Sequence, residues 1–177
     1  SVKIKDINGD GKINADDRVP ISKDPDFTLS LNTSLKWKSL DFYMDWYGVS
    51  GRKIQNAYLN ESNSGGSLQG KLNGIKVNYW TPFNPSDEFP RPSHNTNVPY
   101  HGALAIQDAS YIRLRTLQLG YSFPAKWIKQ LSLSRLRVYA TATNLLTFTD
   151  FKSYSPELTP GAYPESRQYV FGINVSF

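Results

Sequence analysis

Five long runs of the chain alternate apolar and polar side chains with a period of two, which places alternate residues on opposite faces of a β-strand. In the run 27–37, apolar residues occupy nearly every odd position and Ser, Thr, Asn or Lys every even one. The others cover residues 40–50, 110–123, 135–148 and 167–177. Such runs exceed the usual strand of about five or six residues and suit the roughly 9–11 residues that cross a bilayer at a tilt. The sequence therefore predicts an all-β chain with strands long enough to span a membrane.

The polar positions and the connections decide between two all-β architectures. The polar positions hold mainly Ser, Thr, Asn, Gln, Gly and Tyr, which suits a water-filled lumen better than the exposed face of a sandwich. Short connections at 38–39 and 124–134 alternate with long ones at 51–109 and 149–166, as in outer-membrane barrels. The alternative is a soluble, calcium-stabilised β-sandwich that binds carbohydrate or an adhesion partner. Since the smallest barrels need about eight strands, either several copies combine their strands or the chain is a segment of a larger barrel, and we favour the segment. Ile112 and Leu114 put the start of the third run out of phase, which predicts either a β-bulge or emergence from the membrane near these residues.

Composition excludes several functional classes. The chain has no cysteine, which rules out a thiolate metal site, an iron–sulfur cluster and a cysteine nucleophile. Its formal charge of +5 comes from scattered residues, and we expect no nucleic-acid partner. Asp41 and Asp45 share a strand face but lie about 13 Å apart, wider than the roughly 5–9.5 Å between glycosidase carboxylates. No other catalytic motif is recognisable, so we expect no enzyme activity.

Residues 6–17, DINGDGKINADD, fit the twelve-residue calcium loop of the EF-hand. Oxygen-bearing side chains recur at alternate positions, and Gly11 permits the sharp turn at position six. Position twelve is Asp17, whose arm is shorter than that of the usual Glu. The alternative is an Asx/Gly turn without metal. We expect a structural Ca²⁺ ion, with the candidate ligands Asp6, Asn8, Asp10, Lys12 (through its carbonyl), Asn14 and Asp17.

Two further groups are candidates for contact with cargo or with a partner. Polar and aromatic residues at the polar positions would line the lumen, where they contact either cargo or a plug: Tyr43, Asp45, Tyr47, Tyr139 and Asn144. Trp80, Phe83 and Phe89 lie in a proline-rich stretch of the long loop 51–109. Such aromatics either stack on sugars or meet a lid protein, or they pack into a neighbouring loop, which is the expectation we favour.

Six segments in a fixed order carry a family resemblance that spans essentially all 177 residues. They are KDINGDGKINADD (5–17), FTLSLNTSLKWKSLDFYMDWYGVSG (27–51), WTPFNPSDEFPRP (80–92), ASYIRLRTLQLGYSFP (109–124), RVYATATNLLTFTDFKSYSPE (137–157) and YPESRQYVFGINVSF (163–177). Each motif alone is weak, but their order is specific. Together they resemble the C-terminal part of SusC/RagA-type TonB-dependent outer-membrane transporters.

The resemblance implies a fold, a location and partners. The chain would supply the last five or so antiparallel strands of a 22-stranded transmembrane β-barrel with long extracellular loops, in the bacterial outer membrane. Residues 1–26 would be extracellular, residues 27–177 would form the strands and loops, and the C-terminus would be periplasmic. The whole transporter would import glycans or peptides with a SusD-like surface lipoprotein. The plug, and the TonB contact made through it, would lie upstream or on another polypeptide.

Overall fold

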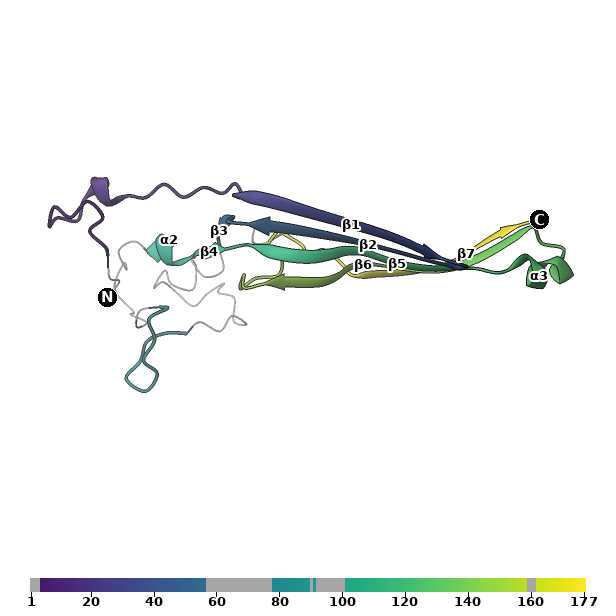
Figure 1. Ribbon diagram of the computed structural model, residues 1–177. Helices are drawn as coiled ribbons and strands as arrows, with labels where there is room; N and C mark the ends of the chain where they lie inside the picture. Colours follow the sequence, from purple (N-terminus) through teal and green to yellow (C-terminus); the bar gives the residue numbers. More distant parts are fainter. Residues whose placement is uncertain (1–3, 57–77, 90, 92–100, 159–161) are drawn as a thin grey trace. The chain divides into compact units, whose positions relative to one another are not determined.

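The computed structural model describes residues 4–56, 78–89, 91, 101–158 and 162–177 (Figure 1). By their contacts these residues fall into two compact units. The first comprises Ser1–Asp24, Arg52–Asp108 and Phe151–Ala162, and the second Pro25–Gly51, Ala109–Asp150 and Tyr163–Phe177. Within the described residues, no helix combines the length and the apolar character needed to cross a membrane.

The second unit is built on one antiparallel sheet of five strands, in the order β1-β2-β5-β6-β7. The strands lie side by side as a meander in Figure 1. Their bounds are β1 (Phe27–Trp37), β2 (Leu40–Ser50), β5 (Tyr111–Ser122), β6 (Arg135–Thr149) and β7 (Gln168–Ser176). The expected all-β antiparallel class is therefore confirmed. The expected runs 110–123 and 167–177 extend past the observed strands by one residue at each end.

Two short connections join strands at the same end of this sheet. Lys38 and Ser39 link β1 to β2, with Trp37 opposite Leu40, and Lys38 adopts the positive φ of 53° that a tight hairpin requires. The second connection contains α3 (Ala125–Ile128) and η2 (Lys129–Leu131) between β5 and β6. The N–H of Ser122, the last residue of β5, donates to the carbonyl of Ser39 at 2.8 Å, so the first connection lies beside the start of the second.

The strand register gives the sheet one apolar face and one polar face. In one row across the strands Phe42, Leu119, Ala140 and Phe171 are partners, and in the adjacent row Tyr43, Gln118, Thr141 and Val170 are. Direct partners share a face, so the two rows alternate between faces. Phe42 also pairs with Leu35 of β1, so the first row is apolar across all five strands, and Val170 is the one apolar residue in the second row.

The apolar face is open. Leu29, Leu119 and Ile173 are 63%, 53% and 67% exposed, and no described element covers them as a second layer. A soluble sandwich would bury these side chains against a second sheet. The sandwich alternative is therefore wrong for this sheet.

The expected bulge lies slightly beyond the predicted position. The β2–β5 register shifts between Asp45 and Trp46, and the β5–β6 register steps from Leu114 to Thr116. Both shifts centre on Arg115, and on β6 the residue Asn144 takes a positive φ of 53° at this level. The bulge restores the phase, so that Arg113 and Thr116 both lie on the polar face while Leu114 and Leu117 lie on the apolar face.

The first unit contains the acidic loop and most of the long connections. Its regular elements are η1 (Ala15–Asp17), β3 (Lys53–Gln55), α2 (His101–Leu104) and β4 (Ile106–Asp108), of which β3 and β4 pair. Phe89 and Ala105 are buried together, with Tyr79 and Leu104 packed against them. Residues 57–77, 90 and 92–100 of the expected loop lie outside the described residues, so the loop is only partly accounted for.

Candidate functional site

The polar face of the sheet carries the predicted lumen residues. Tyr43, Asp45 and Tyr47 lie on it from β2, opposite Ser34, Asn32 and Ser30 of β1. Tyr139 lies on the same face from β6, opposite Gly120 of β5. These four predicted residues therefore share one surface, which spans the central strands of the sheet.

An ion pair crosses this face over a glycine. The guanidinium of Arg137 on β6 donates to both carboxylate oxygens of Asp41 on β2, with Nε 3.0 Å from Oδ1. Gly120 of β5 lies between them, and a Cβ at that position would collide with both charged groups. Bidentate Arg–carboxylate pairs hold a fixed geometry, so this pair braces three strands across the polar face.

A second glycine accommodates the ring of Tyr139. Tyr139 lies opposite Gly172 of β7, and a Cβ there would collide with the tyrosine ring. The guanidinium carbon of Arg137 lies 5.1 Å from the centre of the same ring, within cation–π range. The Tyr139 side chain is therefore laid along the sheet, where it covers the backbone of β7.

A cluster of arginines gathers where the bulge changes the phase of β5. Arg113 is 4% exposed, although it is charged, and its Nε donates to Thr147 Oγ1 at 3.0 Å. Its guanidinium also forms an ion pair with Glu165 at 3.4 Å. Arg115 stacks on Tyr47, with its guanidinium carbon 3.5 Å from the ring centre. The bulge therefore places two guanidinium groups and the Tyr47 ring on one side of the sheet.

The remaining contacts keep the polar face ordered. Tyr43 donates its hydroxyl to Asn32 Oδ1 at 3.1 Å, and Thr141 donates to Gln118 Oε1 at 3.2 Å. The side chain of Asn144, the fifth predicted lumen residue, donates to the carbonyl of Ser166 at 3.2 Å. Asn144 thus anchors the segment before β7 beside the bulge.

The acidic loop folds around its own backbone N–H groups. Asp6 accepts from the N–H groups of Gly9 and Gly11 at 2.7 and 2.8 Å. Asp17 accepts from Ile7 and Asn14 at 2.8 and 2.9 Å, and these N–H groups hold the pKa of its carboxyl below the usual value. Gly9 and Gly11 both have a positive φ, a backbone conformation that residues with a side chain rarely adopt. Asp6 and Asp17, at positions one and twelve, thus both bind backbone N–H groups of the loop, which closes it into a turn.

The other candidate ligands complete the same turn. Asn8 Oδ1 accepts from the N–H of Asp10, and Asp10 Oδ1 accepts from the N–H of Lys12. Asn14 caps η1 by accepting from the N–H of Asp16. Within the described residues, no three His, Asp or Glu side chains are grouped closely enough to hold a metal ion. A cation in this loop would therefore depend on amide and carbonyl oxygens as well as on the carboxylates.

The three aromatic residues of the proline-rich stretch have different surroundings. Phe89 is 7% exposed and packs on Ala105, and the N–H of Trp80 donates to its carbonyl. Phe83 is fully exposed, and Trp80 is 40% exposed. Phe89 is therefore a core residue of the loop, which is the packed arrangement that we favoured for these aromatics, whereas Trp80 and Phe83 reach solvent.

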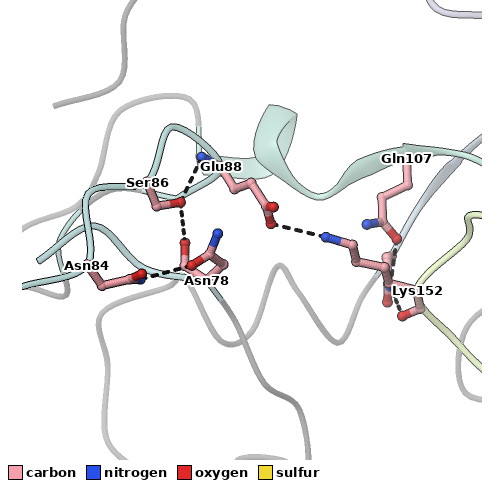
Figure 2. Close-up of polar contacts among 7 residues, drawn as sticks. Asn78, Asn84, Ser86, Glu88, Gln107 and Lys152 are labelled. Atoms are coloured by element: carbon pink, nitrogen blue, oxygen red, sulfur yellow. Dashed lines mark hydrogen bonds and ion pairs between the residues drawn. The ribbon is translucent and has the colours of Figure 1, made fainter.

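A polar network supports this loop (Figure 2). Asn78 accepts a side-chain bond from Asn84 at 2.9 Å, and its carbonyl accepts from Ser86, which in turn bonds the N–H of Glu88. Lys152 forms an ion pair with Glu88 at 3.0 Å, which lowers the pKa of that carboxyl. The loop is thus connected to the segment that follows β6.

Buried Asn56 connects the same part of the chain to Gln107 and Lys152. Its side chain is fully buried and donates to Gln107 Oε1 and to the carbonyl of Lys152, each at 3.1 Å. Satisfying both amide hydrogens offsets the cost of burying this group. Three segments distant in sequence therefore meet at one asparagine.

Sequence patterns do not reveal the roles of several of these residues. They single out Asp41 only for a spacing from Asp45 that argues against catalysis, and they do not indicate partners for Arg137 or Arg113. The observed roles depend on partners 96 and 52 residues away, Asp41 for Arg137 and Glu165 for Arg113. The spacing of the arginines by two, which places each pair on one strand face, is the only signal in the sequence.

Known proteins resemble the chain over nearly its whole length. The TonB-dependent receptor P3 of Formosa agariphila is 31% identical over 189 residues, which cover 97% of this chain and 18% of the receptor. The TonB-dependent receptor SusC of Bacteroides thetaiotaomicron is 27% identical over 179 residues, covering 97% of this chain and 17% of SusC. No protein-family model matches.

Solved structures agree with the sequence relatives. The RagAB peptide importer in its closed-closed state matches with a TM-score of 0.74 and 28% identity, covering 95% of this chain and 20% of that chain. The chain thus spans about a fifth of the proteins that it matches. These relatives are receptors and an importer, which is consistent with the expectation of a non-enzyme.

The ion pair over Gly120 predicts an unequal effect of two Gly→Ala substitutions. Gly120→Ala is expected to separate Asp41 from Arg137 and to lower the free energy of unfolding by about 1 kcal/mol. Gly48→Ala is the matched control, because a Cβ there meets its nearest atoms at an ordinary 3.6 Å. Denaturant unfolding of the intact protein measures both. If Gly120→Ala lowers the free energy of unfolding by the same amount in a protein whose Asp41 and Arg137 are both changed to Ala, the ion pair is not the cause and the prediction is contradicted.

The lowered pKa of Asp17 predicts how the acidic loop responds to pH. A carboxyl with a depressed folded-state pKa stabilises the loop fully above its unfolded value, near 3.8, and loses this effect as pH falls through the folded value. The amide signals of Ile7 and Asn14 are therefore expected to keep their bonded positions until the pH is below 3.8. NMR titration of the intact protein tests this. Loss of those bonds above that pH, or an unchanged titration in Asp17→Asn, would contradict it; Asp24→Asn is the control.

Proposed function

Because the chain belongs to the SusC/RagA-type family of TonB-dependent receptors, we propose that it forms the last five strands of an outer-membrane import barrel. The complete barrel of this proposal has 22 strands. β1 and β7 end the strand order of the sheet, so each offers a backbone edge to a further strand of the same barrel. Closing these edges satisfies the N–H and C=O groups that hydrocarbon cannot.

One observation carries the proposal: the sheet has an exposed apolar face backed by a hydrogen-bonded polar face. Leu29, Leu119 and Ile173 are more than half exposed on the first face. A soluble protein rarely leaves an apolar surface of this extent open to water, whereas a transmembrane barrel turns it to lipid. The opposite face then borders the lumen.

The short connections give the proposed orientation. Outer-membrane barrels have short turns in the periplasm and long loops outside the cell. Lys38–Ser39 and the α3 connection would then be periplasmic, together with Phe177. The acidic loop in residues 1–26 and the long connections would be extracellular.

The polar face would act as a rigid wall during transport. Asp41 and Arg137 brace it, and Tyr43, Asp45 and Tyr47 present hydroxyl, carboxylate and ring surfaces to the lumen. These groups would contact either cargo or the plug. The cargo would be a glycan or a peptide; the related RagAB complex is a peptide importer.

The partners of this proposal act on opposite sides of the barrel. A SusD-like surface lipoprotein would cover the extracellular side, where Trp80 and Phe83 reach solvent. The plug would fill the lumen, and TonB would act through the plug. Exposed aromatic rings on an ordered loop are suited to a protein contact or to stacking on a sugar.

The acidic loop would bind Ca²⁺ as a structural ion on the extracellular side. Asp6, Asp10 and Asp17 would supply carboxylates together with amide and carbonyl oxygens of the loop, and the glycines at positions four and six allow the turn that the calcium loop needs. Binding would stiffen the segment that leads into β1. The short arm of Asp17 predicts an affinity suited to extracellular calcium rather than to a cytosolic sensor.

The proposed lipid face predicts that an arginine is tolerated at one position of β5 and not at its neighbour. Leu119→Arg is expected to destabilise the inserted barrel, because a charge on the lipid face costs up to about 2–4 kcal/mol near mid-bilayer. Gln118→Arg is the matched control on the polar face and is expected to be tolerated. Urea unfolding of the full-length receptor in lipid vesicles measures both. Equal tolerance of the two arginines would contradict the lipid-facing assignment.

The calcium proposal predicts heat on titration with Ca²⁺. The intact protein is expected to bind one ion at this loop, and Asp10→Ala is expected to abolish that binding. Asp24→Ala, outside the loop, is the control and should leave it unchanged. Isothermal calorimetry makes the measurement. No heat from the wild type, or equal heat from Asp10→Ala, would refute the proposal.

A further inference from the structure

The net charge of the chain is concentrated in two short segments. Residues 36–40 and 123–135 contain five basic residues and no acidic one: Lys36, Lys38, Lys126, Lys129 and Arg135. The rest of the chain contains fifteen basic and fifteen acidic residues, which balance. The whole formal charge of +5 therefore resides in these two segments.

The fold brings both segments to one end of the sheet. Residues 36–40 include the β1–β2 turn, and residues 123–135 hold the α3 connection. The hydrogen bond from the Ser122 N–H to the Ser39 carbonyl joins the first connection to the last residue of β5, immediately before the second segment. The positive charge is thus concentrated at the short-turn end, although it is divided in the sequence.

Three of the lysines are exposed beside aromatic rings. Lys38 holds its ammonium 4.8 Å from the centre of the Trp37 ring, and Trp37 is 66% exposed. Lys126 and Lys129 flank Trp127, which is 58% exposed, while Ile128 anchors the helix in a buried position. No described carboxylate forms an ion pair with these three lysines. Ammonium groups and indole rings are therefore presented together.

The aromatic rings connect this cluster to the apolar face. Trp127 lies 6.3 Å from Phe123, and Phe123 lies 5.1 Å from Tyr121, measured between ring centres. Tyr121 is the partner of Leu40, and Leu40 is the partner of Trp37, so these side chains share the apolar face. A ligand bound at the short-turn end would therefore contact an apolar surface and ammonium groups that lie next to each other.

The opposite end of the apolar face lacks this arrangement among the residues that the structure describes. Trp46 stacks on Phe148 there at 6.4 Å, so aromatic residues are present. The nearby arginines, Arg113 and Arg115, lie on the polar face beside Tyr47 instead. The pairing of cations with exposed indoles is a property of the short-turn end.

We propose that the short-turn end binds the headgroups of anionic phospholipids through Lys38, Lys126 and Lys129. Trp37 and Trp127 would sit at the level of the glycerol and carbonyl groups, and the ammonium groups would reach the phosphates. A lysine near an anionic membrane surface strengthens binding about fivefold. This inference rests on the proposed function, since it requires the apolar face to lie in a bilayer.

The test uses the full-length receptor that contains this chain, reconstituted in vesicles. The first vesicles contain phosphatidylcholine alone, and the second contain one quarter phosphatidylglycerol. Quenching of tryptophan by brominated phosphatidylglycerol or brominated phosphatidylcholine reports which lipid adjoins the protein. The test variant is K38Q/K126Q/K129Q. The control K5Q/R18Q/K23Q removes the same charge from exposed residues of the acidic-loop segment.

The inference predicts at least tenfold preference for phosphatidylglycerol at the wild-type protein, lost in the test variant and kept in the control. Soluble inorganic phosphate should not compete, because it offers no hydrocarbon. No preference in an inserted wild-type barrel, equal losses in both variants, or competition by phosphate would overturn the inference. A wild-type receptor that fails to insert even into phosphatidylcholine would instead overturn the proposed function.

Discussion

The structure depends on the separation of most apolar and polar side chains between the two faces of one sheet. Alternation along each strand produces an apolar face only if the register places the apolar residues of all five strands on the same side of the sheet. The Trp37–Leu40 turn sets that phase between β1 and β2, and the bulge at Arg115 corrects it where the sequence slips by one residue. A single uncorrected slip would turn the apolar side chains of β5 to the polar face.

Glycine gives the polar face its particular form. Gly120 and Gly172 leave room for the Asp41–Arg137 pair and for the Tyr139 ring, so large side chains lie flat against the strands. Aromatic cover of a strand glycine also protects its backbone. The result is a polar face on which the Asp41–Arg137 pair joins β2 to β6 across β5.

The sequence predicted the features that depend only on neighbouring residues in the chain. Period-two alternation located all five strands, because strand faces follow directly from residue order. Contacts between distant segments could not be foreseen: Arg137 and Asp41 meet across β5, and Arg113 reaches Glu165. The burial of Phe89 depends on Ala105, which no pattern near Phe89 reveals. Partner choice across a sheet or a loop is fixed by tertiary packing, which single-sequence patterns do not encode.

The two-faced sheet is tested most directly by cysteine scanning of β5, since the chain has no native cysteine. Spin labels would be placed singly at residues 116–119 and 121 of the reconstituted receptor, and collision with oxygen and with a water-soluble nickel complex would be measured. We expect labels at 117, 119 and 121 to collide mainly with lipid-dissolved oxygen and those at 116 and 118 mainly with nickel. Labels at the odd positions that are shielded from both reagents would show a dry protein interior and contradict the lipid-facing assignment.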